Sequence, residues 1–134
     1  MKYYLDSNIF IYTAIYSGGK TEKAFSILEQ IGKGIDSAIT SSLTLDEFLW
    51  KVMKQRSRSE TLELAKGIYR YPNLDIVEVK AIDVFSAILL MEKYEKLKPR
   101  DAIHAAVAIS AGVSQIYSDD PDFDEIKDIK REKL

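Results

Sequence analysis

Cysteine is absent from the 134 residues of the chain, and histidine occurs only once, at His104. Without cysteine there can be no disulfide, no thiolate zinc site and no cysteine nucleophile. A single histidine excludes the HExxH metalloprotease motif and zinc sites that need several histidines. A serine–histidine–carboxylate triad through His104 stays open on composition alone, but no GxSxG elbow supports it. Any catalytic chemistry must therefore rest mainly on other groups.

Long apolar runs are also missing. The stretch Ile9-Phe10-Ile11-Tyr12 is too short to span a membrane, and Asp6 interrupts any apolar core of a signal peptide. We therefore expect a soluble, cytoplasmic protein without a membrane segment. The length corresponds to one domain, and 46% apolar residues are enough for a core.

The charges are nearly balanced, with 21 acidic and 19 basic residues and a net charge of −2. This balance argues against a protein that coats DNA. It leaves room for an enzyme that handles nucleic acid through a local basic rim and a metal ion.

Apolar patterns and turn residues predict strands that alternate with helices. Such alternation is typical of parallel βαβ units, in which helices cover both faces of a sheet. We predict one domain, residues 1–134, with a three-layer α/β fold and a central, mostly parallel sheet of about five strands flanked by helices. The predicted strands are 2–5, 35–40, 74–79 and 113–118, with a candidate fifth at 126–130; the predicted helices are 9–15, 21–31, 42–55, 59–71, 82–97 and 99–112.

Acidic residues follow the predicted strands. Asp6 comes directly after the first strand, and the pair Asp119-Asp120 comes after the fourth. Glu47 lies early in the helix after the second strand, and Asp101 lies in the first turn of the helix at 99–112. Ligands of such folds bind at the carboxyl ends of the strands. Clustered carboxylates repel one another unless a cation neutralises them, and all-oxygen sites suit Mg²⁺ or Mn²⁺.

Each acid also has a purely structural interpretation. Asp6 could be a turn residue, Glu47 could complete a Thr44-x-x-Glu47 capping box, and Asp101 could stabilise the helix dipole. Against these, Glu47 points away from the apolar stripe of its helix, beside Trp50, which indicates a second, semi-buried environment. The helix after Asp101 is apolar nearly all round and so is expected to be central.

His104 lies three residues after Asp101 and on the same helix face, and we expect a structural or supporting role for it. Basic residues form two groups near the acids, which are either solvated helix ends or a rim for a phosphate backbone. The groups are Lys51, Lys54, Arg56 and Arg58, and Lys93, Lys96, Lys98 and Arg100. The predicted substrate contacts among them are Lys51, Lys54, Arg56 and Arg100.

Four segments together resemble the PIN-domain ribonucleases, and the compact chain resembles the VapC-type toxins of toxin–antitoxin pairs. Each motif is weak by itself, but all four in order across nearly the whole chain are specific. The segments are Tyr4-Leu5-Asp6-Ser7-Asn8-Ile9, Thr44-Leu45-Asp46-Glu47-Phe48, Arg100-Asp101-Ala102-Ile103-His104-Ala105-Ala106 and Ile116-Tyr117-Ser118-Asp119-Asp120-Pro121-Asp122-Phe123-Asp124.

The resemblance implies divalent-metal-dependent cleavage of RNA, a parallel α/β sheet, an antitoxin partner and a homodimer. It implies catalytic and metal-coordinating roles for Asp6, Glu47, Asp101 and one acid within 118–122. Asn8 and Ser118 correspond to polar supporting residues of the family. In this chemistry, Mg²⁺ or Mn²⁺ polarises the phosphate and lowers the pKa of a bound water, so no side-chain nucleophile is needed.

The fourth acid is ambiguous, because the segment is Asp119-Asp120-Pro121-Asp122. We predict Asp120, because alternation along a strand would give Ser118 and Asp120 the same direction and turn Asp119 away. Pro121 would hold Asp120 at the end of the strand. Asp122 would cap the following segment or assist at longer range.

Three other functions fit the sequence less well. Gly18-Gly19-Lys20-Thr21 resembles the end of a nucleotide-binding P-loop, but Ala14 occupies the position of the first glycine. An aspartyl phosphatase would need a second acid where Asn8 stands. A PIN-like module that only binds partners is less consistent with four retained acids. The sequence does not separate a toxin from an RNA-processing PIN nuclease.

Overall fold

The computed structural model describes residues 1–134 and has a five-stranded sheet at its centre. All four strand pairings are parallel, and the strand order is β3-β2-β1-β4-β5. The predicted fold class is confirmed, with a sheet that is entirely parallel. The strands are β1 (Lys2–Leu5), β2 (Ser37–Ser41), β3 (Leu74–Val77), β4 (Gln115–Tyr117) and β5 (Lys130–Glu132).

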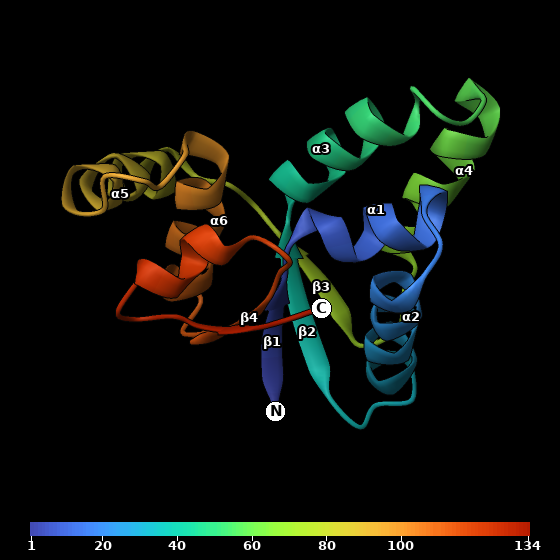
Figure 1. Ribbon diagram of the computed structural model, residues 1–134, viewed down its shortest axis with the longest axis horizontal. Coiled ribbons are helices and arrows are strands. Elements are labelled where there is room, and N and C mark those ends of the chain that lie inside the picture. Colours follow the sequence, from blue (N-terminus) through green and yellow to red (C-terminus); the bar gives the residue numbers. More distant parts are fainter.

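Helices cover both faces of the sheet (Figure 1). The first four helices and the sheet enclose one apolar core, and the last two helices pack on the other face around a second core. The helices are α1 (Ser7–Ile15), α2 (Gly19–Gly32), α3 (Ser42–Val52), α4 (Arg58–Tyr69), α5 (Ala81–Lys93) and α6 (Pro99–Ser110), and a short 3₁₀ helix η1 covers Pro121–Glu125. None of these helices combines the length and the apolar character needed to cross a membrane.

The helices follow the apolar spacing of the sequence. On α2, Ala24, Ile27, Leu28 and Ile31 are buried, as expected for one face of a helix. α6 begins at Pro99, a favourable first-turn position, and is buried around most of its circumference. It contacts both α5 and β2, which confirms the expectation of a central helix.

The C-terminal part differs from the sequence-based prediction. The fifth strand is not 126–130 but Lys130–Glu132, and a 3₁₀ helix precedes it. Ile126 and Ile129 are buried in the second core. Their apolar character therefore reflects packing beneath the sheet edge rather than strand alternation. Helices α3 and α5 also end earlier than predicted, at Val52 and Lys93.

The order of the strands reverses at β1, which has β2 on one side and β4 on the other. Parallel α/β sheets leave a crevice at such a switch point, outside the carboxyl ends of the strands. Asp6 directly follows β1, and its N–H donates to the Tyr117 carbonyl at the end of β4 (3.0 Å). The chain segments after β1 and β4 therefore meet at the edge where Figure 1 shows the starts of α1 and α3.

Candidate metal centre

Asp6 is the most firmly held acid of this edge. It is the N-cap of α1, and its Oδ1 accepts a hydrogen bond from Ser7 N (2.7 Å). Its Oδ2 accepts from Ser118 Oγ (2.6 Å) and from Asn8 Nδ2 (3.2 Å). The side chain is buried, and burial raises the pKa of Asp6 even though these donors oppose the rise. Asn8 and Ser118 thus both contact Asp6, and their supporting role in catalysis stays a prediction.

Asp101 and Asp120 lie beside each other across the crevice. Asp101 is in the first turn of α6, and Asp120 is the N-cap of η1, where it accepts from Asp122 N (2.9 Å). Burial, a hydrogen bond shared with Asp120 and the charge of Asp6 raise the pKa of Asp101 to about 8. Single ligand atoms of Asp101, Asp120 and Asp122 all lie within 4.8 Å of one another. Asp101 therefore keeps its proton at neutral pH, where an ordinary aspartate has lost it.

Glu47 and Asp6 both lie against a buried histidine, His104. His104 Nε2 makes a very close contact with Glu47 and lies 3.5 Å from Asp6 Oδ1. Its Nδ1 lies 2.6 Å from the hydroxyl of Tyr4, which in turn contacts Ser41 Oγ (2.8 Å). Burial lowers the pKa of His104, but the charges of Asp6 and Glu47 outweigh burial and raise it overall. The predicted supporting role of His104 agrees with this geometry.

The capping-box interpretation of Glu47 is wrong. α3 has Ser41 as its N-cap without a side-chain hydrogen bond, and Thr44 Oγ1 instead bonds to Thr40 Oγ1 (2.7 Å). Glu47 is half-buried, as expected, because it turns inward to His104. Trp50, which suggested that environment, is itself 68% exposed.

Asp119 faces a different set of partners from Asp120. It accepts hydrogen bonds from the Tyr12 hydroxyl (2.5 Å) and from Lys20 Nζ (2.9 Å). Partial burial raises the pKa of Asp119, but these two donors outweigh it and lower the pKa overall.

The strand argument used for the fourth acid does not apply, because β4 ends at Tyr117. Asp120 is instead placed by its own backbone N–H, which donates to Ser118 Oγ (3.0 Å), the same oxygen that donates to Asp6. The assignment of Asp120 as the fourth acid stays a prediction, now with this hydrogen bond as its basis.

These carboxylates line one open, polar cavity of about 630 Å³. Of the predicted substrate contacts, the structure brings only Lys51 to it. Lys54 Nζ lies over the Trp50 ring, 4.6 Å from its centroid. The cavity is lined by Asp6, Ser7, Asn8, Ile11, Tyr12, Tyr16, Glu47, Lys51, Asp101, Asp119, Asp120 and Pro121.

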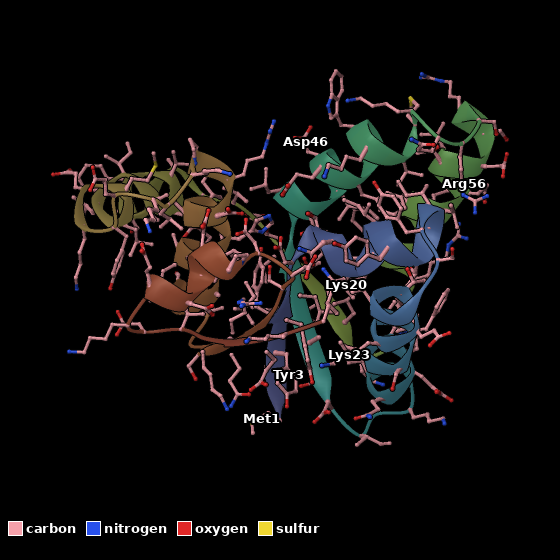
Figure 2. All side chains as sticks on the ribbon, viewed as in Figure 1. Met1, Tyr3, Lys20, Lys23, Asp46 and Arg56 are labelled. Carbon is pink, nitrogen blue, oxygen red and sulfur yellow. The ribbon has the colours of Figure 1, made fainter.

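Arg56 and Arg100 are not part of this cavity. Arg56 Nε donates to the Ala14 carbonyl (2.6 Å), and its Nη1 bonds to Glu60 (3.1 Å). Figure 2 places Arg56 beside α4, at the end of α1 that is remote from Asp6. Arg100 is exposed at the start of α6. For Arg56, a structural role fits the geometry better than a substrate contact.

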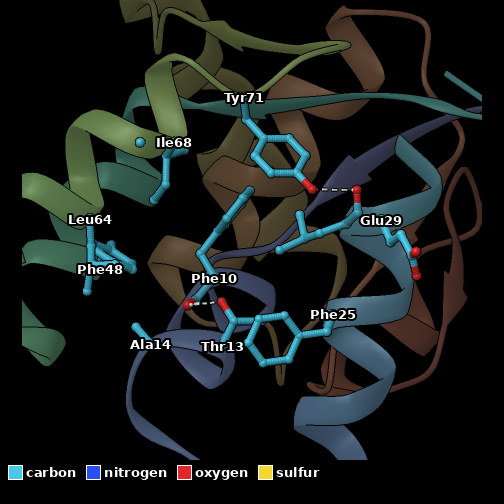
Figure 3. A pocket seen from close by; sticks show the side chains of 11 residues that line it. Phe10, Thr13, Ala14, Phe25, Glu29, Phe48, Leu64, Ile68 and Tyr71 are labelled. Atoms are coloured by element: carbon cyan, nitrogen blue, oxygen red, sulfur yellow. Dashed lines mark hydrogen bonds between the residues drawn. The ribbon is translucent and has the colours of Figure 1, made fainter. Parts of the chain in front are cut away.

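Sequence reasoning missed the partners Tyr4 and Tyr12 and an apolar groove. Tyr4 lies on β1 two residues before Asp6, but its contact with His104 joins residues 100 positions apart, which no local pattern records. The groove, of about 460 Å³, lies among α1, α2 and α4 (Figure 3). Figure 3 shows Phe10 and Phe25 along it and the Tyr71 hydroxyl, which donates to the Leu28 carbonyl (2.6 Å).

The donor set fits a hard divalent cation. The acids that line the cavity offer carboxylate oxygens, which suit Mg²⁺ or Mn²⁺, and His104 joins Asp6 and Glu47 as a candidate nitrogen ligand. Burial is the largest cause of the raised pKa of Asp101 and of Asp6, and the neighbouring carboxylates raise the pKa of both groups further. A buried acidic cluster of this kind is the chemical feature of the site.

The fold and this edge define a class of α/β domain that gathers carboxylates at the switch point of a parallel sheet. The chain belongs to the PIN domain family, whose model matches residues 3–129. A curated relative, Ribonuclease VapC7 of Mycobacterium tuberculosis, is 27% identical over 127 residues, which cover 93% of this chain and 86% of the relative.

Solved structures agree with this fold. VapBC2 from Rickettsia felis, bound to a DNA fragment from its promoter, matches with a TM-score of 0.77 at 20% identity. The match covers 100% of this chain and 99% of the VapBC2 chain. VapC20 of Mycobacterium tuberculosis, a sarcin–ricin loop cleaving toxin, matches with a TM-score of 0.76 at 16% identity. The match covers 92% of this chain and 93% of the VapC20 chain.

Proposed function

We propose that the protein is a ribonuclease that depends on Mg²⁺ or Mn²⁺ and cleaves RNA phosphodiester bonds in the cytoplasm. The observation that carries the proposal is the group of carboxylates at the switch point of a PIN-family sheet, around Asp6, Asp101 and Asp120. The related ribonuclease VapC7 supports the choice of RNA as substrate. The donor atoms do not distinguish Mg²⁺ from Mn²⁺.

Each acid has a distinct part in this proposal. Asp6 is fixed in one orientation by Ser7, Asn8 and Ser118, and with Asp101 and Asp120, which line the same cavity, it would hold the cation. A bound divalent ion supplies Lewis-acid activation of the phosphate and of a water.

Glu47 stands next to this centre and is oriented by His104, so that it can position the attacking water. Lys51 lines the same cavity and can bind a neighbouring phosphate. None of these residues needs to act as a covalent nucleophile.

The test is cleavage of a labelled single-stranded RNA by the purified protein. Cleavage should need Mn²⁺ or Mg²⁺, stop with EDTA and fall by orders of magnitude in Asp6→Asn. Asp46→Asn is the matched control, because Asp46 is exposed and points away from the molecule on α3 (Figure 2). Cleavage by Asp6→Asn at the wild-type rate would assign the activity to another site or to a contaminant.

We further propose that the protein is the toxin of a VapBC-type pair and forms a homodimer. Toxin–antitoxin complexes among the structures that share its fold support this, including VapBC from Salmonella typhimurium bound to DNA. The groove of Figure 3 offers an apolar surface to an antitoxin segment. An RNA-processing PIN nuclease is the alternative, and it would lack such a partner.

The partner is tested through the genome and by co-expression. If the protein is a toxin, a short open reading frame next to its gene should encode a protein that co-purifies with it and blocks RNA cleavage. Absence of inhibition would favour the RNA-processing alternative. Sedimentation of the isolated protein as a monomer would contradict the homodimer.

A further inference from the structure

Two tyrosines of α1 lie on the wall of the acidic cavity. Tyr12 and Tyr16 are one helical turn apart, and both line the cavity that contains Asp6, Asp101 and Asp120. Tyr12 is half-buried, whereas Tyr16 is 53% exposed. Tyr16 is therefore not part of either apolar core, and much of its side chain is accessible from the cavity.

The ring of Tyr16 is supported by its neighbours. Tyr12 is fixed by its hydroxyl, which donates to Asp119, and Asp119 is held in turn by Lys20. Tyr16 packs against Tyr12 with ring centroids 5.4 Å apart and planes at 71°. An edge-to-face contact of this kind covers one face of only one ring. Tyr16 therefore keeps at least one free face on a support that is already ordered.

The distance between Tyr16 and the acids fits a nucleotide adjacent to the cleavage position. Asp6 and Tyr16 cap the two ends of α1, so their Cα atoms are roughly 15 Å apart at about 1.5 Å per residue. Lys51 lines the same cavity and offers a positive charge to the RNA backbone. A base that stacks on Tyr16 would belong to a nucleotide next to the cleavage position rather than at it.

We propose that Tyr16 is a stacking platform for an unpaired base of the RNA strand whose neighbouring phosphate reaches the acidic centre. The inference rests on the proposed ribonuclease function and specifies its substrate. Aromatic rings stack on any base but need the base to be unpaired, so the platform selects single strands and loops over duplexes without selecting a sequence.

The test measures binding separately from cleavage. Fluorescence anisotropy with a labelled ten-nucleotide oligo(A) is recorded in EDTA, which stops metal-dependent cleavage. Tyr16→Ala should weaken binding by about 5- to 150-fold, the range found when one stacked base loses its aromatic partner. Tyr16→Phe should bind as the wild type does, because only the ring is required. Tyr69→Ala is the matched control, since Tyr69 is 63% exposed but lies on α4 outside the cavity.

A second oligomer separates stacking from other effects. A chain of ten abasic ribose phosphates keeps the charge of the RNA but has no bases, so it should bind wild type and Tyr16→Ala equally. Equal binding of oligo(A) by wild type and Tyr16→Ala, or the same loss with the abasic chain, would overturn the proposal. Metal-dependent cleavage that persists in that case leaves the proposed function intact. Stacking at Tyr16 without any RNA cleavage would refute the function and retain the platform.

Discussion

Burial is the main cause that raises the pKa of Asp101 to about 8, and the neighbouring carboxylates of Asp120 and Asp6 raise it further. Two other carboxylates of the cavity, Asp6 and Glu47, are met by the imidazole of His104 instead. The residues of the site thus reduce the repulsion between carboxylates in two ways, with a proton held on Asp101 on one side and a histidine on the other. A cation that binds Asp6, Asp101 and Asp120 would replace the proton that Asp101 holds.

The metal-free protein should lose stability as the pH rises from 5 to 8. The folded state holds a proton on Asp101 up to about pH 8, whereas the unfolded state releases it near pH 4. The raised pKa of His104 acts with the same sign, because its stabilising charge is lost as the pH rises through the folded-state pKa. Urea unfolding in EDTA should show a slope of up to about 1.4 kcal/mol per pH unit for each such proton.

Asp101→Asn should make this slope shallower without abolishing it, since His104 remains. Stability that is constant or increases between pH 5 and pH 8 in the wild type would contradict the assigned protonation.

Asp120→Asn should reduce Mn²⁺-dependent RNA cleavage far more than Asp119→Asn. Asp120 is tied to Asp6 through Ser118 Oγ, whereas Asp119 is neutralised by Lys20 and bound by Tyr12. Cleavage rates of the two variants at saturating Mn²⁺ provide the comparison. If Asp119→Asn is the more damaging change, the fourth acid has been assigned wrongly.

At the scale of elements, α1 organises the site from both ends. Its N-cap is Asp6, and near its C-terminus the Ala14 carbonyl accepts a hydrogen bond from Arg56, in the turn between α3 and α4. The hydrogen bond thus ties α1 to the turn that follows α3, and these two helices carry Asp6 and Glu47 to the cavity. Among the basic residues predicted to contact the substrate, Arg56 thus has a structural position, whereas Lys51 lies where it can contact the substrate.

Arg56→Ala should lower the free energy of unfolding by about 1–2 kcal/mol, the usual cost of one partly exposed charged hydrogen bond. Its KM for RNA should not change. Lys51→Ala should do the opposite and raise KM while leaving the stability unchanged, because Lys51 is exposed and lines the cavity. Urea unfolding and steady-state cleavage of both variants test the pair. An increase in KM for Arg56→Ala would restore Arg56 as a substrate contact.

The sequence predicted those elements whose pattern is local. The spacing on α2 and the apolar circumference of α6 follow directly from helical geometry, and the acids after β1 and β4 follow from strand ends. The contact between Glu47 and His104 joins residues 57 positions apart and depends on how α3 and α6 meet, which no local pattern records. β5 was misplaced because Ile126 and Ile129 pack into a core without forming a strand.

At the scale of the whole molecule, the strand order places the acids. Because β1 lies between β2 and β4, four segments converge on one edge: the starts of α1, α3 and α6 and the loop after β4. Two apolar cores on opposite faces hold these segments in place. The fold therefore brings like charges together, and their repulsion lowers the stability of the folded state. A cation that binds only the folded state should raise the free energy of unfolding again.

The most direct test of the account is a calorimetric titration of Mn²⁺ into the wild type and into an Asp6→Asn/Asp101→Asn double variant, with thermal unfolding of both. The wild type should bind Mn²⁺ and gain about 2.7 kcal/mol of stability at a concentration near 100 times Kd, which EDTA reverses. The double variant should bind weakly and gain little from Mn²⁺. Absence of binding by the wild type, or an equal gain in both proteins, would contradict the assignment of a metal centre to these acids.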